Sequence, residues 1–200
     1  MIKTVIFDIG NVLAGFDWEP YFRQAAGDEE IFERLVKATV MNPVWDEYDR
    51  GIWTEEEVLQ GFIDSDPEIE AVIRKAVANM DEIINPKEYA VSWVQELKKK
   101  GYQVLVLSNY SKKAHRETKR ALAFLKYTDG GILSYQDKMI KPQPEIYQLL
   151  LKRYHLNASE CVFLDDRKEN VEGAAKEGIH TILFESREQA LRELKELGVE

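Results

Sequence analysis

The apolar residues of the chain fall into short continuous runs and longer stretches with helical spacing. Four runs are apolar almost throughout and are bounded by polar residues or glycine, as is typical of strands buried on both faces of a parallel sheet. These runs cover residues 4–7, 104–107, 161–164 and 181–184. From about residue 86 onward, helical stretches separate the runs. The alternation predicts an α/β fold with a doubly wound, Rossmann-like parallel sheet and right-handed crossovers.

Two of the helical stretches have recognisable ends. Asn85-Pro86 is typical of a helix start, and the pattern that follows it closes at Gly101. Ser186 and Gln189 have the spacing of a capping box, which predicts the start of the last helix.

The stretch from residue 15 to residue 85 has no buried-strand run. Its only clear signals are helical, namely a capping box from Thr54 to Glu57 and a start at Asp66-Pro67. A helical stretch of this length between the first strand and the rest of a sheet is typical of an insertion. We therefore predict a core domain of residues 1–14 and 86–200 and an inserted helical cap domain of residues 15–85.

Composition narrows the classes of partner. The net charge of -9 would repel nucleic acid and anionic lipid, so we expect neither as a partner. Cys161 is the single cysteine, which excludes an intrachain disulfide, and no apolar stretch approaches the roughly 20 residues that span a bilayer. These features predict a soluble, cytoplasmic protein. The oligomeric state cannot be read from such patterns.

Polar residues follow three of the predicted strands. Asp8 comes after the first run, Ser108-Asn109 after the second, and Asp165-Asp166 after the third. In an open parallel sheet, ligands bind at the carboxyl ends of the strands. We therefore expect these side chains to form one site.

These polar residues belong to three of four motifs that occur in a characteristic order, and the other motif contains Lys141. The motifs are FDIGNVL at residues 7–13, LSN at 107–109, KPQPEIY at 141–147 and FLDDRKEN at 163–170. In this order, and with an insertion after the first motif, the chain resembles the haloacid dehalogenase superfamily over essentially its whole length. The resemblance implies a magnesium-dependent phosphatase that acts on a small phosphorylated metabolite.

The resemblance also implies a role for each motif residue. Asp8 would attack phosphorus and form an aspartyl-phosphate. Lys141 would neutralise the transferring phosphoryl group and hold Asp8, while Ser108 and the backbone near Asn109 would donate hydrogen bonds to phosphate oxygens.

The expected metal ligands are oxygen atoms from both ends of the chain. Asp8, Asp166 and the backbone carbonyl of Gly10 would hold Mg²⁺, with Asp165 beside them. Asp165 and Asn170 would also orient Lys141 and the waters around the metal.

Gly10 is a departure from the usual pattern of this superfamily. Most of its phosphatases have an aspartate at this position, which protonates the leaving group and then activates water. The glycine resembles a subgroup similar to bacterial alpha-D-glucose-1-phosphate phosphatases. Without this acid, we expect substrates whose leaving groups depart readily, such as sugar 1-phosphates or acyl phosphates. Asp17 is a candidate substitute acid.

Aromatic residues in the predicted cap are candidates for substrate contacts. Trp45 and Tyr48 would suit the face of a sugar, although cap aromatics are more often part of the core. Two other functions stay open. One is a 2-haloacid dehalogenase, against which the Asp165-Asp166 pair argues, and the other is an inactive binding protein that kept the fold.

Overall fold

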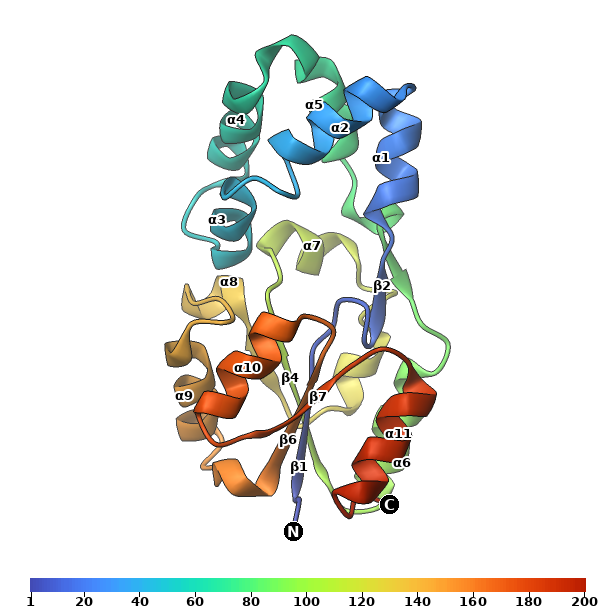
Figure 1. Cartoon of the computed structure of the whole chain (residues 1–200), viewed down its shortest axis with the longest axis vertical. Helices are drawn as coiled ribbons and strands as arrows, with labels where there is room; N and C mark the ends of the chain where they lie inside the picture. Colours follow the sequence, from blue (N-terminus) through green and yellow to red (C-terminus); the bar gives the residue numbers. More distant parts are fainter.

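The computed structural model describes all 200 residues and is built around a sheet of five parallel strands (Figure 1). The strands are β1 (Thr4–Phe7), β4 (Gln103–Ser108), β5 (Gly131–Leu133), β6 (Cys161–Asp165) and β7 (His180–Leu183). Their order across the sheet is β5-β4-β1-β6-β7. The chain thus runs from the central β1 to one edge and then to the other, which confirms the predicted doubly wound sheet.

Helices cover both faces of this sheet because successive side chains of a strand point to opposite faces. Val5 and Phe7 belong to one apolar cluster, on the side of α6 and α11, whereas Ile6 belongs to a second, on the side of α9 and α10. The bounds of these helices are α6 (Ala90–Lys99), α11 (Arg187–Glu196), α9 (Pro144–Arg153) and α10 (Lys168–Lys176). Burial on both faces explains why β1, β4 and β6 are almost entirely apolar, whereas the edge strand β7 is exposed at His180 and Leu183.

Five helices lie together beyond the carboxyl ends of the strands, at the far end of the molecule from both termini (Figure 1). They are α1 (Trp18–Ala26), α2 (Glu29–Ala38), α3 (Val44–Arg50), α4 (Glu55–Ser65) and α5 (Glu70–Ala76). We call them the helical segment. Thr54 and Glu57 form the predicted capping box of α4, and the turn η1 (Pro67–Ile69) leads into α5 as the Asp66-Pro67 pattern predicts. The division into a core and a cap domain stays a prediction.

The helical segment is joined to the sheet by a pair of short antiparallel strands. These are β2 (Ala14–Phe16) and β3 (Ile84–Pro86). The predicted helix start at Asn85-Pro86 was therefore wrong, because both residues pair with β2 and the helix begins only at Ala90. Proline lacks a backbone donor and is tolerated at the end of such an edge strand.

The remaining elements are short. They are α7 (Lys112–Glu117), α8 (Ser134–Asp137), and the turns η2 (Met80–Glu82), η3 (Ala123–Tyr127) and η4 (Ala158–Glu160). The edge strand β5 was not predicted, because it has three residues and begins with Gly131. A side chain at Gly131 would place its Cβ 2.2 Å from the carbonyl oxygen of Val106. Close backbone packing thus requires glycine in this strand.

Strand register places the polar motifs at one level. Phe7 lies opposite Val106 of β4 and Leu164 of β6. Asp8, one residue further along, therefore lies between the ends of β4 and β6, where Ser108 and Asp165 are found. None of the helices is both long and apolar enough to cross a bilayer.

Candidate active site

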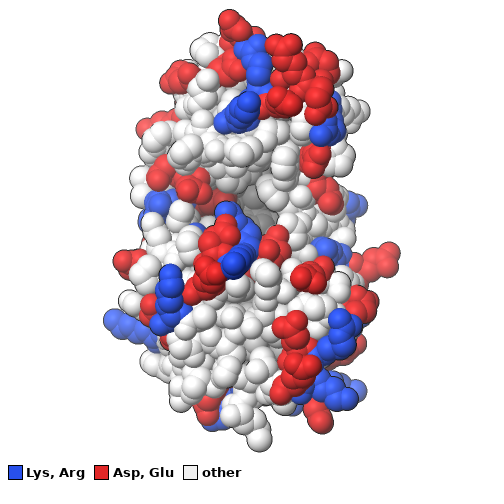
Figure 2. Space-filling model, viewed as in Figure 1, with Lys and Arg blue, Asp and Glu red and all other residues white.

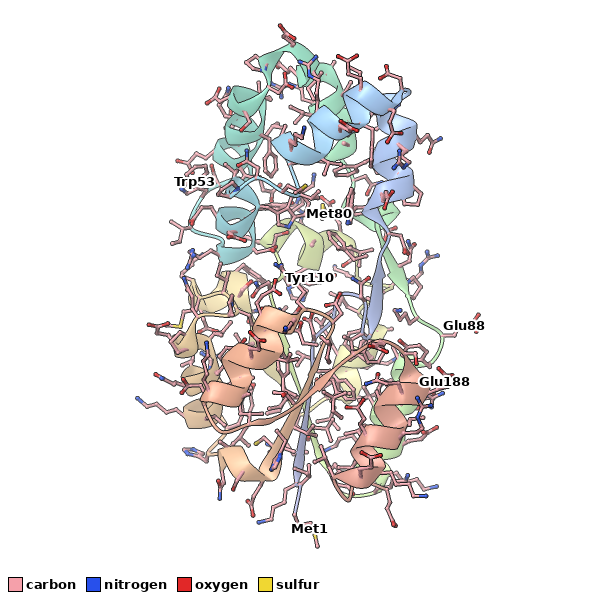
Figure 3. All side chains as sticks on the ribbon, in the orientation of Figure 1. Met1, Trp53, Met80, Glu88, Tyr110 and Glu188 are labelled. Atoms are coloured by element: carbon pink, nitrogen blue, oxygen red, sulfur yellow. The ribbon has the colours of Figure 1, made fainter.

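A pocket of about 520 Å³ lies where the carboxyl ends of β1, β4 and β6 face the helical segment. Figure 2 shows the molecule hollowed between these two parts. Met80 and Tyr110, which both line the pocket, lie between the sheet and the helical segment (Figure 3). The site therefore has one wall from the sheet and one from the inserted helices.

Asp8 is the first residue after β1 and forms part of the pocket lining. Its backbone N–H donates to the carbonyl of Leu164 at 2.9 Å, which continues the pairing with β6. The side chain is almost completely buried, and its Oδ1 lies 2.9 Å from Lys141 Nζ. This ion pair lacks the alignment of a hydrogen bond, so Oδ1 has no hydrogen-bond partner in the protein.

Lys141 joins the first motif to the last. Its ammonium group contacts Asp8 and also lies 2.6 Å from Asp165 Oδ2, and the lysine side chain is 1% exposed. Burial alone would lower the pKa of Lys141, but the charges of Asp165 and Asp8 outweigh it and raise the pKa above its ordinary value. Lys141 therefore stays a cation, positioned next to the predicted nucleophile.

Asn109 fixes the backbone of Lys141. Its amide group donates to the Lys141 carbonyl at 3.0 Å and accepts from the Lys141 N–H at 2.8 Å. Both Asn109 and the buried Ser108 line the pocket at the end of β4. The side chain of Asn109 thus serves to position Lys141.

Asp165 directs both oxygens into the protein. Oδ2 accepts from Lys141, while Oδ1 accepts from the backbone N–H of Arg167 at 2.8 Å. The amide of Asn170 lies 3.0 and 3.1 Å from the two oxygens. This arrangement suits the predicted role of Asp165 and Asn170 in orienting Lys141.

Asp166 lies on the pocket side and is held by Asn11. Asn11 Nδ2 donates to Asp166 Oδ2 at 2.7 Å, and Asn11 Oδ1 accepts from the N–H of Phe16 at 3.2 Å. Asn11 has a left-handed backbone with φ of 56°, a conformation that asparagine tolerates better than most residues. No role was predicted for Asn11, although its place in the first motif was a signal for one.

The carboxylates of the site fit a divalent cation. Oxygen atoms of Asp8, Asp165 and Asp166 lie within 4.8 Å of one another. Burial is the main cause that raises the pKa of Asp8 to about 7, with Lys141 opposing it and Asp165 adding to it, and burial also raises the pKa of Asp166. A bound cation would compensate the buried negative charge and would give Oδ1 of Asp8, which accepts no hydrogen bond, a second cationic contact beside Lys141. Gly10 also lines the pocket, and its carbonyl already accepts from the Val12 N–H at 2.7 Å.

The three other predicted residues lie in different surroundings. Trp45 of α3 lines the pocket. Tyr48, also in α3, is buried in the larger apolar cluster and does not line the pocket. Asp17 precedes α1, accepts from Asn85 Nδ2 at 3.2 Å and lies outside the pocket lining as well. Of the three, Trp45 is thus placed to touch a ligand in this pocket.

Three charged lining residues had no predicted role. They are Asp46 and Asp49, in α3, and Arg167, after β6. Arg167 was inside the fourth motif, whereas Asp49 carried no signal in the sequence. Its position depends on how the helical segment folds over the sheet.

A family comparison agrees with this geometry. A model described as haloacid dehalogenase-like hydrolase matches residues 2–178. The chain belongs to this family. It is thus a haloacid dehalogenase-like hydrolase, with Asp8, Ser108, Lys141 and Asp166 all inside the matched range.

Individual relatives cover different shares of the chain. Mouse acyl-CoA dehydrogenase family member 10 is 30% identical over 98% of this chain, which spans 19% of that protein. Sesquiterpene phosphatase astK of Aspergillus oryzae is 26% identical over 88% of this chain and 87% of its own length. Among solved structures, a HAD family enzyme of Bacteroides thetaiotaomicron in complex with magnesium and inorganic phosphate has a TM-score of 0.70 at 21% identity, covering 94% of this chain and 96% of that one. The last similarity shows the shared hydrolase fold.

Proposed function

We propose that this hydrolase is a magnesium-dependent phosphatase, which hydrolyses a small phosphorylated metabolite through an aspartyl-phosphate on Asp8. The observation that carries the proposal is the buried pair of Asp8 and Lys141, with Asp166 beside it in an acidic cluster. A carboxylate held next to an ammonium group at the end of a pocket is arranged for nucleophilic attack on an anionic substrate.

The chain's own residues would divide the work of phosphoryl transfer. Asp8 attacks phosphorus, and Lys141 and Ser108 hold the phosphoryl oxygens. Asp165 and Asn109 keep Lys141 in place, because one pairs with its ammonium group and the other with its backbone. Asp8, Asp166 and the Gly10 carbonyl would hold Mg²⁺, whose positive charge would let an anion approach this acidic site.

Two comparisons support the phosphatase over other hydrolase chemistry. One relative is named as a sesquiterpene phosphatase, and one structure of the same fold was solved with magnesium and inorganic phosphate. The acidic pair Asp165-Asp166 argues against a dehalogenase, which attacks carbon and needs no metal. The buried Lys141 argues against an inactive binding protein, because a buried charge is costly to keep.

A sugar 1-phosphate is our first choice of substrate. The pocket has a size that suits a small ligand, and Phe16 and Trp45 give it aromatic surface. Gly10 supplies no acid, and the oxygen of a hemiacetal needs a proton less than a simple alkoxide does.

A panel of phosphorylated metabolites, assayed with and without Mg²⁺, tests the proposal. We expect phosphate release that depends on Mg²⁺, faster release from glucose 1-phosphate than from glucose 6-phosphate, and acid-stable phosphate label on Asp8 after rapid quenching. Asp8→Asn should abolish both release and label. Chloride release from 2-chloropropionate without metal would favour the dehalogenase, and failure of beryllium fluoride to bind with Mg²⁺ would favour the inactive protein.

A further inference from the structure

Gly10 leaves empty space in the pocket at the position where most phosphatases of this superfamily have an acidic side chain. A Cβ built on Gly10 would meet nothing within 4 Å, although Gly10 lines the pocket beside Asp8. The space in front of the nucleophile is therefore free on this side. A proton donor for the leaving group has to come from another wall of the pocket.

Asp49 lies on the opposite wall. It belongs to α3 of the helical segment and lines the same pocket as Asp8. Its side chain is partly buried, yet its carboxyl group forms no hydrogen bond or ion pair with the protein. A carboxyl group in this position is free to contact a ligand. Asp46, one turn earlier in α3, also lines the pocket but is exposed.

Contacts with the core hold this end of α3 in place. The Ser134 hydroxyl donates to the backbone carbonyl of Asp49 at 2.6 Å, and Lys138 Nζ donates to the carbonyl of Gly51. Arg50 Nη1 donates to Gln143 Oε1 at 3.0 Å, in the loop that carries Lys141. Asp49 is thus fixed relative to the catalytic lysine.

Close packing at Gly51 adds to this docking. Gly51 ends α3 with φ of 68°, and a Cβ there would lie 2.8 Å from Tyr135 Cβ in α8. The helix end approaches α8 this closely because Gly51 has no side chain.

The surroundings of Asp49 favour a protonated carboxyl group, chiefly through burial. Burial is the main cause that raises the pKa of Asp49 to about 7, and the charges of Asp46 and Asp8 also raise it. Lys141 and Arg167 act in the opposite direction. A substantial fraction of Asp49 is therefore a carboxylic acid near neutral pH, which is the state that a general acid needs.

From this geometry we infer that Asp49 is the general acid and base of the reaction on Asp8; the inference rests on the proposed phosphatase function. As the bond from Asp8 to phosphorus forms, the bond from phosphorus to the leaving oxygen breaks, and that oxygen takes the proton of Asp49. The Asp49 carboxylate then takes a proton from the water that attacks phosphorus. The phosphate leaves, Asp8 is released as a carboxylate, and Asp49 is protonated again. Asp49 thus supplies the acid that Gly10 cannot, and the expected preference for glucose 1-phosphate then rests on the fit of the pocket and not on the leaving group.

A series of aryl phosphates of similar size tests this role. The wild type and Asp49→Asn are compared on 4-nitrophenyl, phenyl and 4-methoxyphenyl phosphate. The phenolate leaving groups become more basic in this order, so their departure depends more on protonation. We expect the variant to lose at least about 100-fold in turnover on 4-methoxyphenyl phosphate, and less than about 10-fold in the first release of nitrophenol. Without a base for the second step, a burst of nitrophenol and accumulation of labelled Asp8 should follow.

The matched control is Asp46→Asn, which removes an exposed carboxylate from the same helix. It should keep the shallow leaving-group dependence of the wild type. Because it removes a charge that raises the pKa of Asp49, it should move the alkaline limb of the pH profile to lower pH.

The outcomes separate the two proposals. Equal losses of Asp49→Asn on all three phosphates, without a burst, would overturn the role of Asp49 and leave the phosphatase intact. A wild type that neither releases phosphate nor labels Asp8 would overturn the phosphatase and Asp49 together. If Asp49→Asn does not fold, an alkaline limb that Asp46→Asn leaves unmoved would count against Asp49.

Discussion

Lys141 Nζ lies 2.6 Å from Asp165 Oδ2, and the two side chains are 1% and 0% exposed. The pair connects the loop before α9 to the end of β6. Because neither side chain is hydrated, removal of either one would leave the other as a buried charge that lacks this partner. The positions of Asp8 and Lys141 are therefore coupled to each other and to the stability of this part of the protein.

Asp165→Asn should destabilise the protein and lower its turnover. The substitution removes one of the two carboxylates that pair with Lys141. It also places an amide NH₂ group among the donors that contact Asp165 in the wild type, namely Lys141, Asn170 and the Arg167 backbone. We therefore expect a loss of about 3–5 kcal/mol in the free energy of unfolding. Urea unfolding measures this loss. The control is Asp137→Asn, which breaks a partly exposed pair with Arg153 and should cost about 1 kcal/mol or less. Equal costs for the two substitutions would contradict the coupling.

Asn11→Gly should weaken metal binding more than it weakens the fold, because glycine tolerates the left-handed backbone at this position, which alanine would strain. Asn11 orients Asp166 through a 2.7 Å hydrogen bond and leaves the apolar core untouched. Loss of such a supporting partner typically costs 10–100-fold in metal affinity, so we expect half-maximal activity at about 10-fold or more higher Mg²⁺ concentration. An Mg²⁺ titration of the variant decides the point. An unchanged Mg²⁺ requirement would mean that Asp166 holds its position without Asn11.

Mg²⁺ should stabilise the protein more at pH 7.5 than at pH 5. In the metal-free protein the pKa of Asp8 is raised to about 7, above its unfolded value, so its contribution to stability is present at low pH and is lost as pH rises toward 7. A cation binds the ionised form and reverses this loss. At Mg²⁺ concentrations about 100-fold above Kd, we expect Tm to rise by about 5–10 °C at the higher pH. Thermal melts of the wild type and Asp8→Asn check this, and an equal response of both proteins would contradict it.

Trp45→Phe should weaken binding of a sugar phosphate without changing the chemical step. Trp45 lines the pocket, so loss of aromatic surface should raise KM by about fivefold with little change in kcat. Trp53→Phe is the matched control, because Trp53 is 40% exposed and lies outside the pocket lining (Figure 3). Similar kinetics for both variants would mean that Trp45 does not contact substrate.

Much of the sheet and its site follows from the sequence alone. Continuous apolar runs predicted four strands, because a sheet covered on both faces leaves no polar positions inside a strand. The polar residues after these runs, such as Asp8 and Ser108, come together because parallel register brings strand ends to one level. Both signals, the apolar runs and the polar residues that follow them, can be read from one sequence.

The features that were missed depend on distant contacts. β3 contains Asn85-Pro86, which resembles a helix start until its pairing with Ala14 and Gly15 is known. Asp49 is one of many carboxylates in the helical segment, and periodicity does not show which of them lines the pocket that contains Asp8. Only the packing of α3 against α8 selects it.

The pocket contains Asp49 only while α3 is docked against the sheet's end of the site. The contacts with Ser134, Lys138 and Gln143 hold the helix end that carries Asp49, so any movement that lifts α3 to admit substrate would also withdraw Asp49, the proposed proton donor. The open enzyme would then have a nucleophile but no acid or base. Hydrolysis would be confined to the closed state, in which bulk water is kept from the phosphorylated aspartate.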